Sequence, residues 1–266
     1  MTQAKIGFIG CGRMAQALIL GLLEKKVFAP SEIGATDVSM DTLEPFARQT
    51  GITVHADNQS LIKRHDHLLL AIKPQNYASF AGENKKFFSD GKLLVSIVTG
   101  ISLSRLSELS PHSVRVMPNT PALVGAGAAG FCVTASVSPE QIAFTQQIFQ
   151  SVGIAEQVEE SMMDAVTGLS GSGPAYIYLI IEALAQAAVK EGLPETLALN
   201  LAVQTVKGAA LMLEKTGETP SKLRDQVTSP GGTTLEGLKV MESKAIRDIL
   251  QDTVSAAANR SRELGR

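Results

Sequence analysis

Short apolar runs alternate with amphipathic stretches through the first half of the chain. The apolar runs have the length of strands, and the stretches between them repeat apolar residues at helical spacing. Strands that alternate with helices predict βαβ units and a parallel sheet. The expected strands are Lys5–Ile9, Ile33–Thr36, Thr53–His55, His67–Ile72, Leu93–Val98, Val114–Val116 and Gly130–Thr134, and the first two expected helices are Arg13–Lys26 and Met40–Thr50.

The pattern changes after about Val158, where the apolar residues follow helical spacing alone. Three long helices rich in Ala, Leu and Glu are expected at Tyr176–Lys190, Glu195–Lys215 and Lys244–Glu263. Glycine and proline mark the joints between them. The chain is therefore predicted to contain an N-terminal α/β domain, residues 1–158, and a C-terminal all-α domain, residues 159–266.

The stretch Tyr176–Val189 is apolar nearly all round, so a helix there must be covered on every side. The helical half of the chain is too small to cover it alone, which indicates a subunit partner. The longest apolar run, Ala175–Val189, is interrupted by Glu182 and is shorter than the roughly 20 residues of a membrane span. We therefore expect a protein partner and no membrane.

Composition and charge exclude several classes of protein. In 266 residues, 44% hydrophobic residues permit a sizeable core, and the formal net charge is only -2. The chain therefore has no excess of positive charge of the kind that nucleic-acid-binding proteins carry, so no nucleic-acid partner is expected. Cys11 and Cys132 have no Cys or His neighbour at metal-ligand spacing, which predicts two free thiols and no metal site. Free thiols and the absence of a signal-peptide pattern favour a cytoplasmic protein.

A glycine motif connects the first expected strand to the first expected helix: Gly10-Cys11-Gly12-Arg13-Met14-Ala15. In this G-x-G-x-x-A pattern, the first glycine makes the tight turn and the second lets the backbone approach a pyrophosphate. The small third residue lets the helix pack closely on the sheet, and the helix N-terminus offers N–H groups to phosphates. The motif and its context predict dinucleotide binding.

The end of the second expected strand, at Thr36 and Asp37, is the usual position for reading the adenosine ribose. An acidic residue there favours a free 2′-hydroxyl and therefore NADH. Alternatively, Asp37 only caps the following turn, because Asp, Ser and Asp recur at Asp37, Ser39 and Asp41. Arg13 would reach a phosphate from the other side. The choice between NADH and NADPH stays open on the sequence.

Five further segments carry more specific patterns. They are Ala71-Ile72-Lys73-Pro74-Gln75, Arg115-Val116-Met117-Pro118-Asn119-Thr120-Pro121-Ala122, Thr167-Gly168-Leu169-Ser170-Gly171-Ser172-Gly173-Pro174-Ala175-Tyr176, Gly192-Leu193-Pro194 and Ser229-Pro230-Gly231-Gly232-Thr233-Thr234. With the glycine motif, they resemble the pyrroline-5-carboxylate reductase family in order and spacing across nearly the whole chain. The resemblance implies a Rossmann domain followed by a helical dimerisation domain, with the active site formed where two subunits meet.

The resemblance also implies which residues form the site. Besides Thr36 and Asp37 at the ribose, the cofactor side would comprise Ile9, Gly10, Cys11, Gly12, Arg13 and Met14 at the phosphates, Ala71, Ile72, Lys73 and Pro74 along the nicotinamide half, and Asn58 and Gln226 as further contacts. The substrate side would comprise Glu160, Ser229, Gly232, Thr233 and Thr234, with Thr234 as the catalytic residue that reaches the ring nitrogen. Arg13 replaces a frequent Asn and Asp37 is unusual for an NADPH enzyme, so NADPH and NADH both remain candidate cofactors.

The implied activity is the reduction of 1-pyrroline-5-carboxylate to L-proline by NADPH or NADH, the last step of proline biosynthesis. A cyclic iminium carries its own proton, so the reaction needs a hydride donor held in line rather than a strong side-chain acid. The segment Pro230–Thr234 precedes an apolar helical run and supplies backbone N–H groups and hydroxyls for the substrate carboxylate. We expect a homodimer or a higher oligomer of dimers.

Two other functions fit part of the pattern. Another NAD(P)-dependent imine or β-hydroxyacid oxidoreductase would share the two-domain plan. However, Tyr176, Ile177 and Tyr178 stand where β-hydroxyacid dehydrogenases resemble one another in a lysine. A non-catalytic dinucleotide-sensing protein would not need the Ser229–Thr234 loop.

Overall fold

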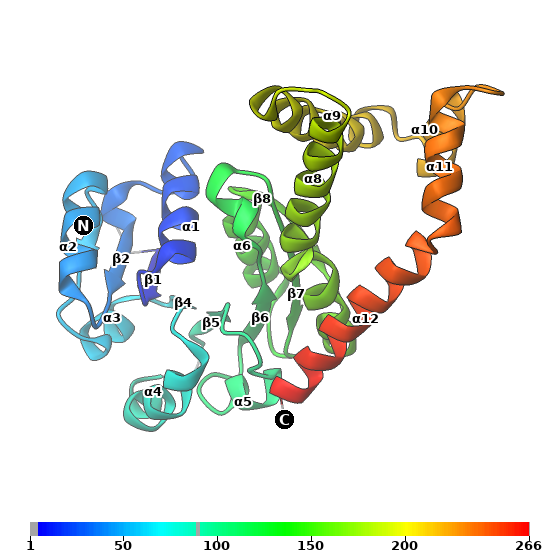
Figure 1. Cartoon of the computed structure of the whole chain (residues 1–266). Coiled ribbons are helices and arrows are strands. Elements are labelled where there is room, and N and C mark those ends of the chain that lie inside the picture. The colour runs from blue at the N-terminus through cyan, green and yellow to red at the C-terminus, as the bar shows by residue number, and fades with distance from the viewer. Residues whose placement is uncertain (1–4, 89–90, 266) are drawn as a thin grey trace. The chain divides into compact units, whose positions relative to one another are not determined.

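One eight-stranded sheet dominates the N-terminal half of the computed structural model, which describes residues 5–88 and 91–265 (Figure 1). The strand order is β3-β2-β1-β4-β5-β6-β7-β8. All neighbours from β3 to β6 are parallel, β7 is antiparallel to β6, and β8 is parallel to β7. The strands are β1 Ile6–Ile9, β2 Ile33–Thr36, β3 Thr53–Val54, β4 His67–Leu70, β5 Leu93–Ser96, β6 Ser113–Met117, β7 Gly127–Val133 and β8 Gly153–Gln157.

The last two strands depart from the expected parallel sheet. The expected run Gly130–Thr134 lies mostly in β7, which enters the sheet antiparallel to β6. The connection between β6 and β7 contains only the short 3₁₀ segment η4, Thr120–Val124, whereas parallel neighbours need a crossover of a dozen or more residues. The edge strand β8 was not expected from the sequence.

Helices cover both faces of the sheet, and each face has its own buried core. The helices of this half are α1 Arg13–Glu24, α2 Met40–Thr50, α3 Asn58–Arg64, α4 Tyr77–Asn84, α5 Leu103–Ser107, α6 Pro139–Gln150 and α7 Met163–Val166. Because side chains alternate along a strand, Phe8 joins one core with Leu18 and Leu43 of α1 and α2, and Ile9 joins the other with Leu61 of α3. Burial on both faces explains why the central strands are continuous apolar runs.

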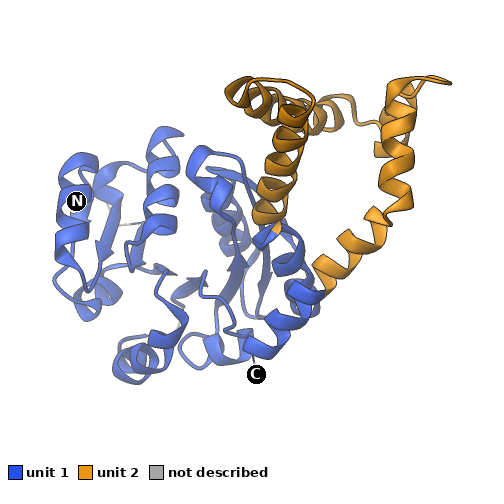
Figure 2. Cartoon of the chain, in the orientation of Figure 1, with its two compact units in different colours: residues 1–172, 256–266 blue, residues 173–255 orange. Residues whose placement is uncertain are grey.

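The chain forms two compact units (Figure 2). Unit 1 consists of Met1–Ser172 and Ala256–Arg266, and unit 2 consists of Gly173–Ser255. Unit 1 contains the sheet and unit 2 is helical, which confirms the expected α/β Rossmann domain followed by an all-α domain. The compact units divide later than the predicted boundary between residues 158 and 159, because residues 159–172 pack with unit 1.

Unit 2 is built from long helices joined by short turns. They are α8 Gly173–Lys190, α9 Glu195–Thr216, α10 Pro220–Gln226, α11 Thr233–Ser243 and the first part of α12 Ile246–Leu264. The three expected long helices correspond to α8, α9 and α12. Helix α12 begins after Ala245 rather than at Lys244, because Ala245 takes a left-handed conformation with φ 54° that separates it from α11.

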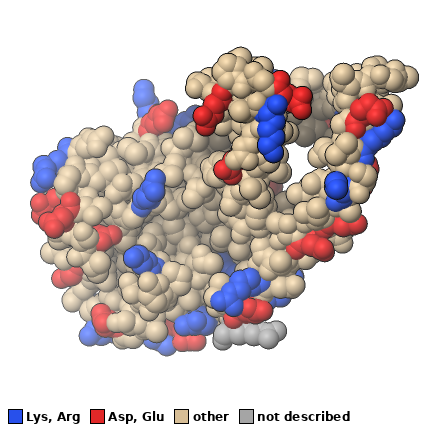
Figure 3. Space-filling view, in the orientation of Figure 1, with Lys and Arg blue, Asp and Glu red and all other residues tan. Residues whose placement is uncertain are grey.

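Helices α8 and α9 leave most of their apolar surface uncovered. Within them, only Ala185, Ala198 and Ala202 are buried. Two continuous helical stretches, Glu160–Lys190 and Glu195–Thr216, are long and apolar enough to cross a membrane. In the most apolar 18-residue part of each stretch, only 6% and 11%, respectively, is buried. On the face drawn in Figure 3, large areas of the surface carry no charged side chain. The apolar faces of α8 and α9 therefore need a cover that the single chain does not provide.

Candidate functional site

The glycine motif forms a tight turn at the carboxyl end of β1, beside the carboxyl end of β4. Gly10 has φ +92°, and a Cβ there would lie 2.6 Å from the carbonyl oxygen of Ala71. The Gly10 N–H donates to the Thr36 carbonyl at 2.8 Å, and the Ala71 N–H donates to the Ile9 carbonyl at 2.8 Å. Only glycine fits this close approach, and the turn brings the ends of β1, β2 and β4 together.

The N-terminus of α1 is open to an anion. Gly12 is its N-cap residue, and no side chain caps the first turn. A Cβ placed on Gly12 would meet nothing within 4 Å, so a ligand can approach the backbone there. The first N–H groups of a helix have no partner within the helix, and together with the helix dipole they favour a phosphate. Ala15 is fully buried, as expected where the helix packs on the sheet. These features fit the pyrophosphate of a dinucleotide.

Asp37 links the end of β2 to the glycine turn. Its Oδ2 accepts a hydrogen bond from the Cys11 N–H at 2.6 Å, and its Oδ1 accepts one from the Ser39 N–H at 2.8 Å. The carboxylate therefore caps the turn after β2 and also lies against the loop that would hold the phosphates. Between Gly12 and Asp37 the chain also forms the 3₁₀ segment η1, Pro30–Glu32, directly before β2.

The segment Ala71–Pro74 continues from β4 into η2, Pro74–Asn76. Lys73 and Pro74 are exposed, Ala71 and Ile72 are half-buried, and the Lys73 carbonyl accepts a hydrogen bond from the Asn76 N–H at 3.0 Å. Asn58 begins α3, which follows β3 at the same edge of the sheet because β3 is parallel to β2. Gly10, Thr36, Asp37 and Ala71 thus meet through direct contacts, whereas Asn58 shares only the edge.

Asn119 was not singled out from the sequence, yet it connects two of the quoted motifs. Its side chain is buried, with Nδ2 donating to the Ser170 carbonyl at 3.0 Å and Oδ1 accepting from the Ala128 N–H at 2.9 Å. Ser170 lies in the π-helical turn η6, Thr167–Gly171. The available sequence signal was an amide residue between Pro118 and Pro121, where a loop needs a polar anchor.

Glu160 lies in unit 1 and contacts other residues of that unit. Its Oε1 accepts a hydrogen bond from the Leu103 N–H at 2.7 Å and lies 3.5 Å from Nη1 of Arg115. Glu160 thereby connects the start of α5 to β6, which is a structural role. A role in substrate binding stays a prediction.

The predicted substrate loop lies in unit 2, between α10 and α11, and Gln226 is the last residue of α10. Gly231 has φ +72°, and the Gly232 N–H donates to the Ser229 carbonyl at 3.0 Å. Gly232 is the N-cap of α11, whose first turn has no side-chain cap. Thr233 and Thr234 begin this helix and are exposed in the single chain. The loop therefore presents backbone N–H groups and two hydroxyls at one helix N-terminus.

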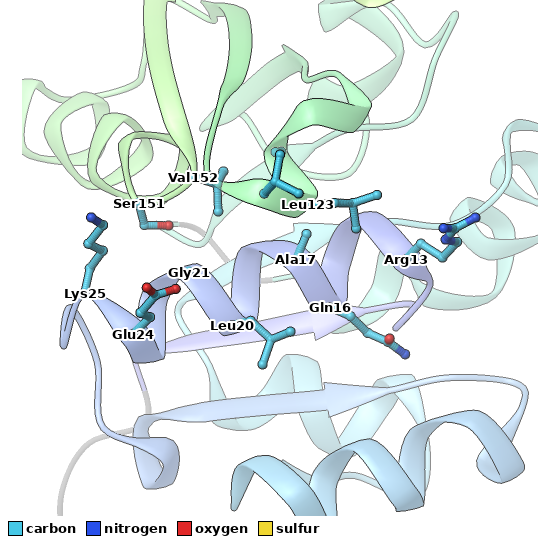
Figure 4. Close-up of a pocket in the computed structure, with 13 residues that line it drawn as sticks. Arg13, Gln16, Ala17, Leu20, Gly21, Glu24, Lys25, Leu123, Ser151 and Val152 are labelled. Carbon is cyan, nitrogen blue, oxygen red and sulfur yellow. The ribbon is translucent and has the colours of Figure 1, made fainter. Parts of the chain in front are cut away.

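A groove of about 500 Å³ runs along α1 on the side that faces η4 (Figure 4). Its lining comprises Arg13, Gln16, Ala17, Leu20, Gly21, Glu24, Lys25, Ala122, Leu123, Val124, Gly125, Ser151 and Val152. Among the predicted cofactor residues, Arg13 alone lines it. The groove therefore lies mostly apart from the predicted dinucleotide site at the strand ends.

The two thiols are not suited to nucleophilic chemistry. Burial, and then the nearby Asp37 carboxylate, raise the pKa of Cys11 to about 11. Burial, and then Glu160, raise the pKa of Cys132 to about 12. Among the described residues, no group of three or more His, Cys, Asp or Glu side chains is placed to hold a metal ion.

Comparisons with known proteins match both halves of the chain. A family model described as pyrroline-5-carboxylate reductase dimerisation matches residues 160–264, and one described as NADP oxidoreductase coenzyme F420-dependent matches residues 5–100. A pyrroline-5-carboxylate reductase of Methanosarcina acetivorans is 44% identical over 269 residues, covering 100% of both chains.

Two solved structures are similar over their full length. A pyrroline-5-carboxylate reductase from Coxiella burnetii is 36% identical with a TM-score of 0.95, covering 100% of both chains. A Plasmodium falciparum pyrroline carboxylate reductase with NADP bound is 34% identical with a TM-score of 0.87, again covering 100% of both chains.

Proposed function

The chain belongs to the pyrroline-5-carboxylate reductase family, and we propose that it reduces 1-pyrroline-5-carboxylate to L-proline with a hydride from NADPH or NADH. It is an oxidoreductase with a dinucleotide-binding Rossmann domain. The reduction would complete proline biosynthesis.

The observation that carries the proposal is a pair of helix N-termini without side-chain caps, each preceded by glycine. The first, at Gly12 and α1, lies at the strand ends of unit 1 and suits the pyrophosphate. The second, at Gly232 and α11, has Thr233 and Thr234 in its first turn and suits a small carboxylate. A dinucleotide and a carboxylate-bearing substrate are the two ligands that this reaction requires.

The residues have distinct roles in the proposed reaction. A bound NADPH or NADH would supply the hydride. The turn from Ile9 to Met14 would hold its phosphates, Thr36, Asp37 and Asn58 its adenosine half, Gln226 a ribose, and Ala71–Pro74 would line its nicotinamide half. A substrate iminium already carries its proton, so no side chain has to act as a strong acid. Hydrogen bonds would instead align the ring.

On the substrate side, the backbone N–H groups of Thr233 and Thr234 in the first turn of α11 would bind the carboxylate. The Gly232 N–H donates to the Ser229 carbonyl and would hold the loop closed beside it. Thr234 would donate its hydroxyl hydrogen bond to the substrate and is the proposed catalytic residue. Glu160 is the weakest member of this set, because Leu103 and Arg115 already contact its carboxylate.

We propose a homodimer, or a higher oligomer of dimers, as the form that carries the active site. The apolar surfaces of α8 and α9 support this, since each helix buries so little within its own chain. The family model that matches residues 160–264 is described as a dimerisation domain, which supports a second copy as the cover rather than lipid. With these faces covered, the protein would be soluble, and we propose a cytoplasmic location.

A turnover assay tests the function directly. Purified protein is mixed with 1-pyrroline-5-carboxylate and either NADH or NADPH, and both nucleotide oxidation and proline formation are followed. We expect one proline for each nucleotide oxidised. Nucleotide binding without any proline would indicate a dinucleotide sensor, and turnover of a β-hydroxyacid in place of the imine would indicate a different oxidoreductase.

A further inference from the structure

We propose that Asp37 excludes the 2′-phosphate of NADPH and makes NADH the preferred hydride donor of this chain. The proposal rests on the proposed function only in assuming that a nicotinamide dinucleotide is the cofactor. It concerns which of the two dinucleotides binds, which family membership leaves open.

The position of Asp37 is set by the glycine turn. Its carboxylate accepts the Cys11 N–H at 2.6 Å and the Ser39 N–H at 2.8 Å. Cys11 stands between the two glycines of the turn, so the carboxylate lies at the end of β2 and directly against the phosphate-binding loop. In a Rossmann domain, this is where the adenosine ribose is read.

The two hydrogen bonds also keep the carboxylate from rotating away. An ionised carboxylate has about four lone-pair positions, and these two bonds use one on each oxygen. The remaining positions can accept hydrogen bonds from the ribose hydroxyls of NADH. A 2′-phosphate brought to the same place would meet a fixed negative charge and could accept no bond from it.

Within the described part of the chain, no salt bridge offsets this charge. Among residues 5–88 and 91–265, neither Asp37 nor Asp41 forms a salt bridge, and Arg48 of α2 pairs with Glu44 at 3.4 Å. The N-terminus of α2 would otherwise attract an anion, but Asp41 already places a carboxylate in its first turn.

Arg13 begins α1, directly after the glycine turn. Its side chain lines the groove between α1 and η4, with Leu123 across from it, whereas Gln16 extends toward the β2 side of α1 (Figure 4). Arg13 therefore does not supply the cation that a 2′-phosphate at the end of β2 would need.

Isothermal titration of the full-length protein with NADH and with NADPH, without substrate, tests the proposal. We expect NADH to bind at least about tenfold more tightly at low salt. The difference should shrink toward about 1 M salt, where the Debye length is about 3 Å. Asp37→Asn removes the charge and keeps the shape of the side chain, with its amide oxygen able to accept one of the two backbone hydrogen bonds. It should improve NADPH affinity relative to NADH by about tenfold.

Glu44→Gln is the control, because it removes a carboxylate of α2 that pairs with Arg48 and makes no contact with the glycine turn in the described structure. Its ratio of affinities should equal that of the wild type. Equal or tighter NADPH binding by the wild type at low salt would overturn the proposal, as would an unchanged ratio in Asp37→Asn. If that variant folds poorly, the salt dependence of the wild-type ratio decides alone. The assay contains no imine, so a failed turnover assay would contradict the proposed function and leave this result standing.

Discussion

The side-chain amide of Asn119 joins the end of β6 to the turn η6, because its Nδ2 donates to the Ser170 carbonyl at 3.0 Å. The same amide accepts the Ala128 N–H at 2.9 Å and is buried. One side chain thus fixes the Met-Pro-Asn-Thr-Pro segment against the segment that leads into α8.

Asn119→Ala should destabilise unit 1, because it leaves the half-buried Ser170 carbonyl and Ala128 N–H without their partner. We expect a loss of about 1–3 kcal/mol in the free energy of unfolding, measured by urea denaturation. Asn76→Ala, at an exposed position, is the control and should unfold like the wild type. A variant of Asn119 as stable as this control would show that the amide is not a structural anchor.

Replacing Gly10 or Gly12 by alanine should weaken dinucleotide binding in both cases, but for different physical reasons. Gly10→Ala places a Cβ 2.6 Å from the Ala71 carbonyl oxygen and holds a left-handed backbone, which alone costs about 1–2 kcal/mol. We expect lower stability and weaker nucleotide binding together. Gly12→Ala meets nothing within 4 Å, so it should lose less stability than Gly10→Ala, mainly through the poorer N-cap, and should still lose dinucleotide affinity.

Thermal unfolding and nucleotide titration on the same samples separate these two effects. Gly82→Ala, another glycine whose Cβ would meet nothing within 4 Å, controls for the substitution itself. If Gly12→Ala bound NADH as tightly as the wild type, the pyrophosphate would not approach this backbone.

Much of the fold could be predicted because the central strands are buried on both faces. The bounds of β2 and α2 agree with the prediction, since Ile33–Thr36 is entirely buried and Met40–Thr50 has a clear apolar face. Strand β8 escaped prediction because an edge strand has no continuous buried run: Ile154 is 59% exposed, and Ala155 alone is buried.

The site was only partly predictable for a different reason. A local pattern such as the glycine motif reports the backbone geometry that its own residues need. The hydrogen bond between Cys11 and Asp37 spans 26 positions, and that between Asn119 and Ser170 spans 51. Such contacts depend on strand order and on how loops meet at a sheet edge, which no local spacing specifies.

Two buried histidines should make unit 1 sensitive to acid. His55 and His65 pack edge to face at 5.1 Å, and Nε2 of His55 has no hydrogen-bond partner among the described residues. Burial, and then Arg64, lower the pKa of His55, while burial lowers that of His65 despite its bond to the Leu61 carbonyl.

The folded state therefore takes up these protons less readily than the unfolded chain, whose histidines titrate near 6.5. Stability should be full above that pH and fall as the pH decreases below it. His55→Leu should match the wild type near pH 8 and unfold at a lower pH in an acid titration followed by circular dichroism. The same acid midpoint in both proteins would contradict this assignment.

The exposed face of α8 provides a test of assembly. Leu179 is 65% exposed in the single chain, and Leu179→Asp would bury an uncompensated charge in the proposed dimer. We expect sedimentation velocity to show a dimer or larger species for the wild type and a shift toward monomer for the variant. Leu20→Asp, at a 45% exposed leucine of α1, should keep the wild-type assembly. A wild-type monomer that is fully active would refute the shared-site proposal.

Thr234 stands in the first turn of α11, two residues after the N-cap Gly232, and is exposed in the single chain. If its hydroxyl donates to the charged substrate, Thr234→Ala removes a hydrogen bond worth about 1.5–3 kcal/mol. The expected loss in kcat/KM for 1-pyrroline-5-carboxylate is about 10- to 100-fold, and the affinity for NADH should not change, because the lost bond is to the substrate. Thr234→Ser keeps the hydroxyl and should restore most of the activity, which a purely structural role of the methyl group would not explain.

Steady-state kinetics over a range of substrate concentrations, with nucleotide affinity measured separately, distinguish these outcomes. Wild-type turnover by Thr234→Ala would remove this residue from the catalytic site and leave the backbone N–H groups of α11 as the substrate's main anchor.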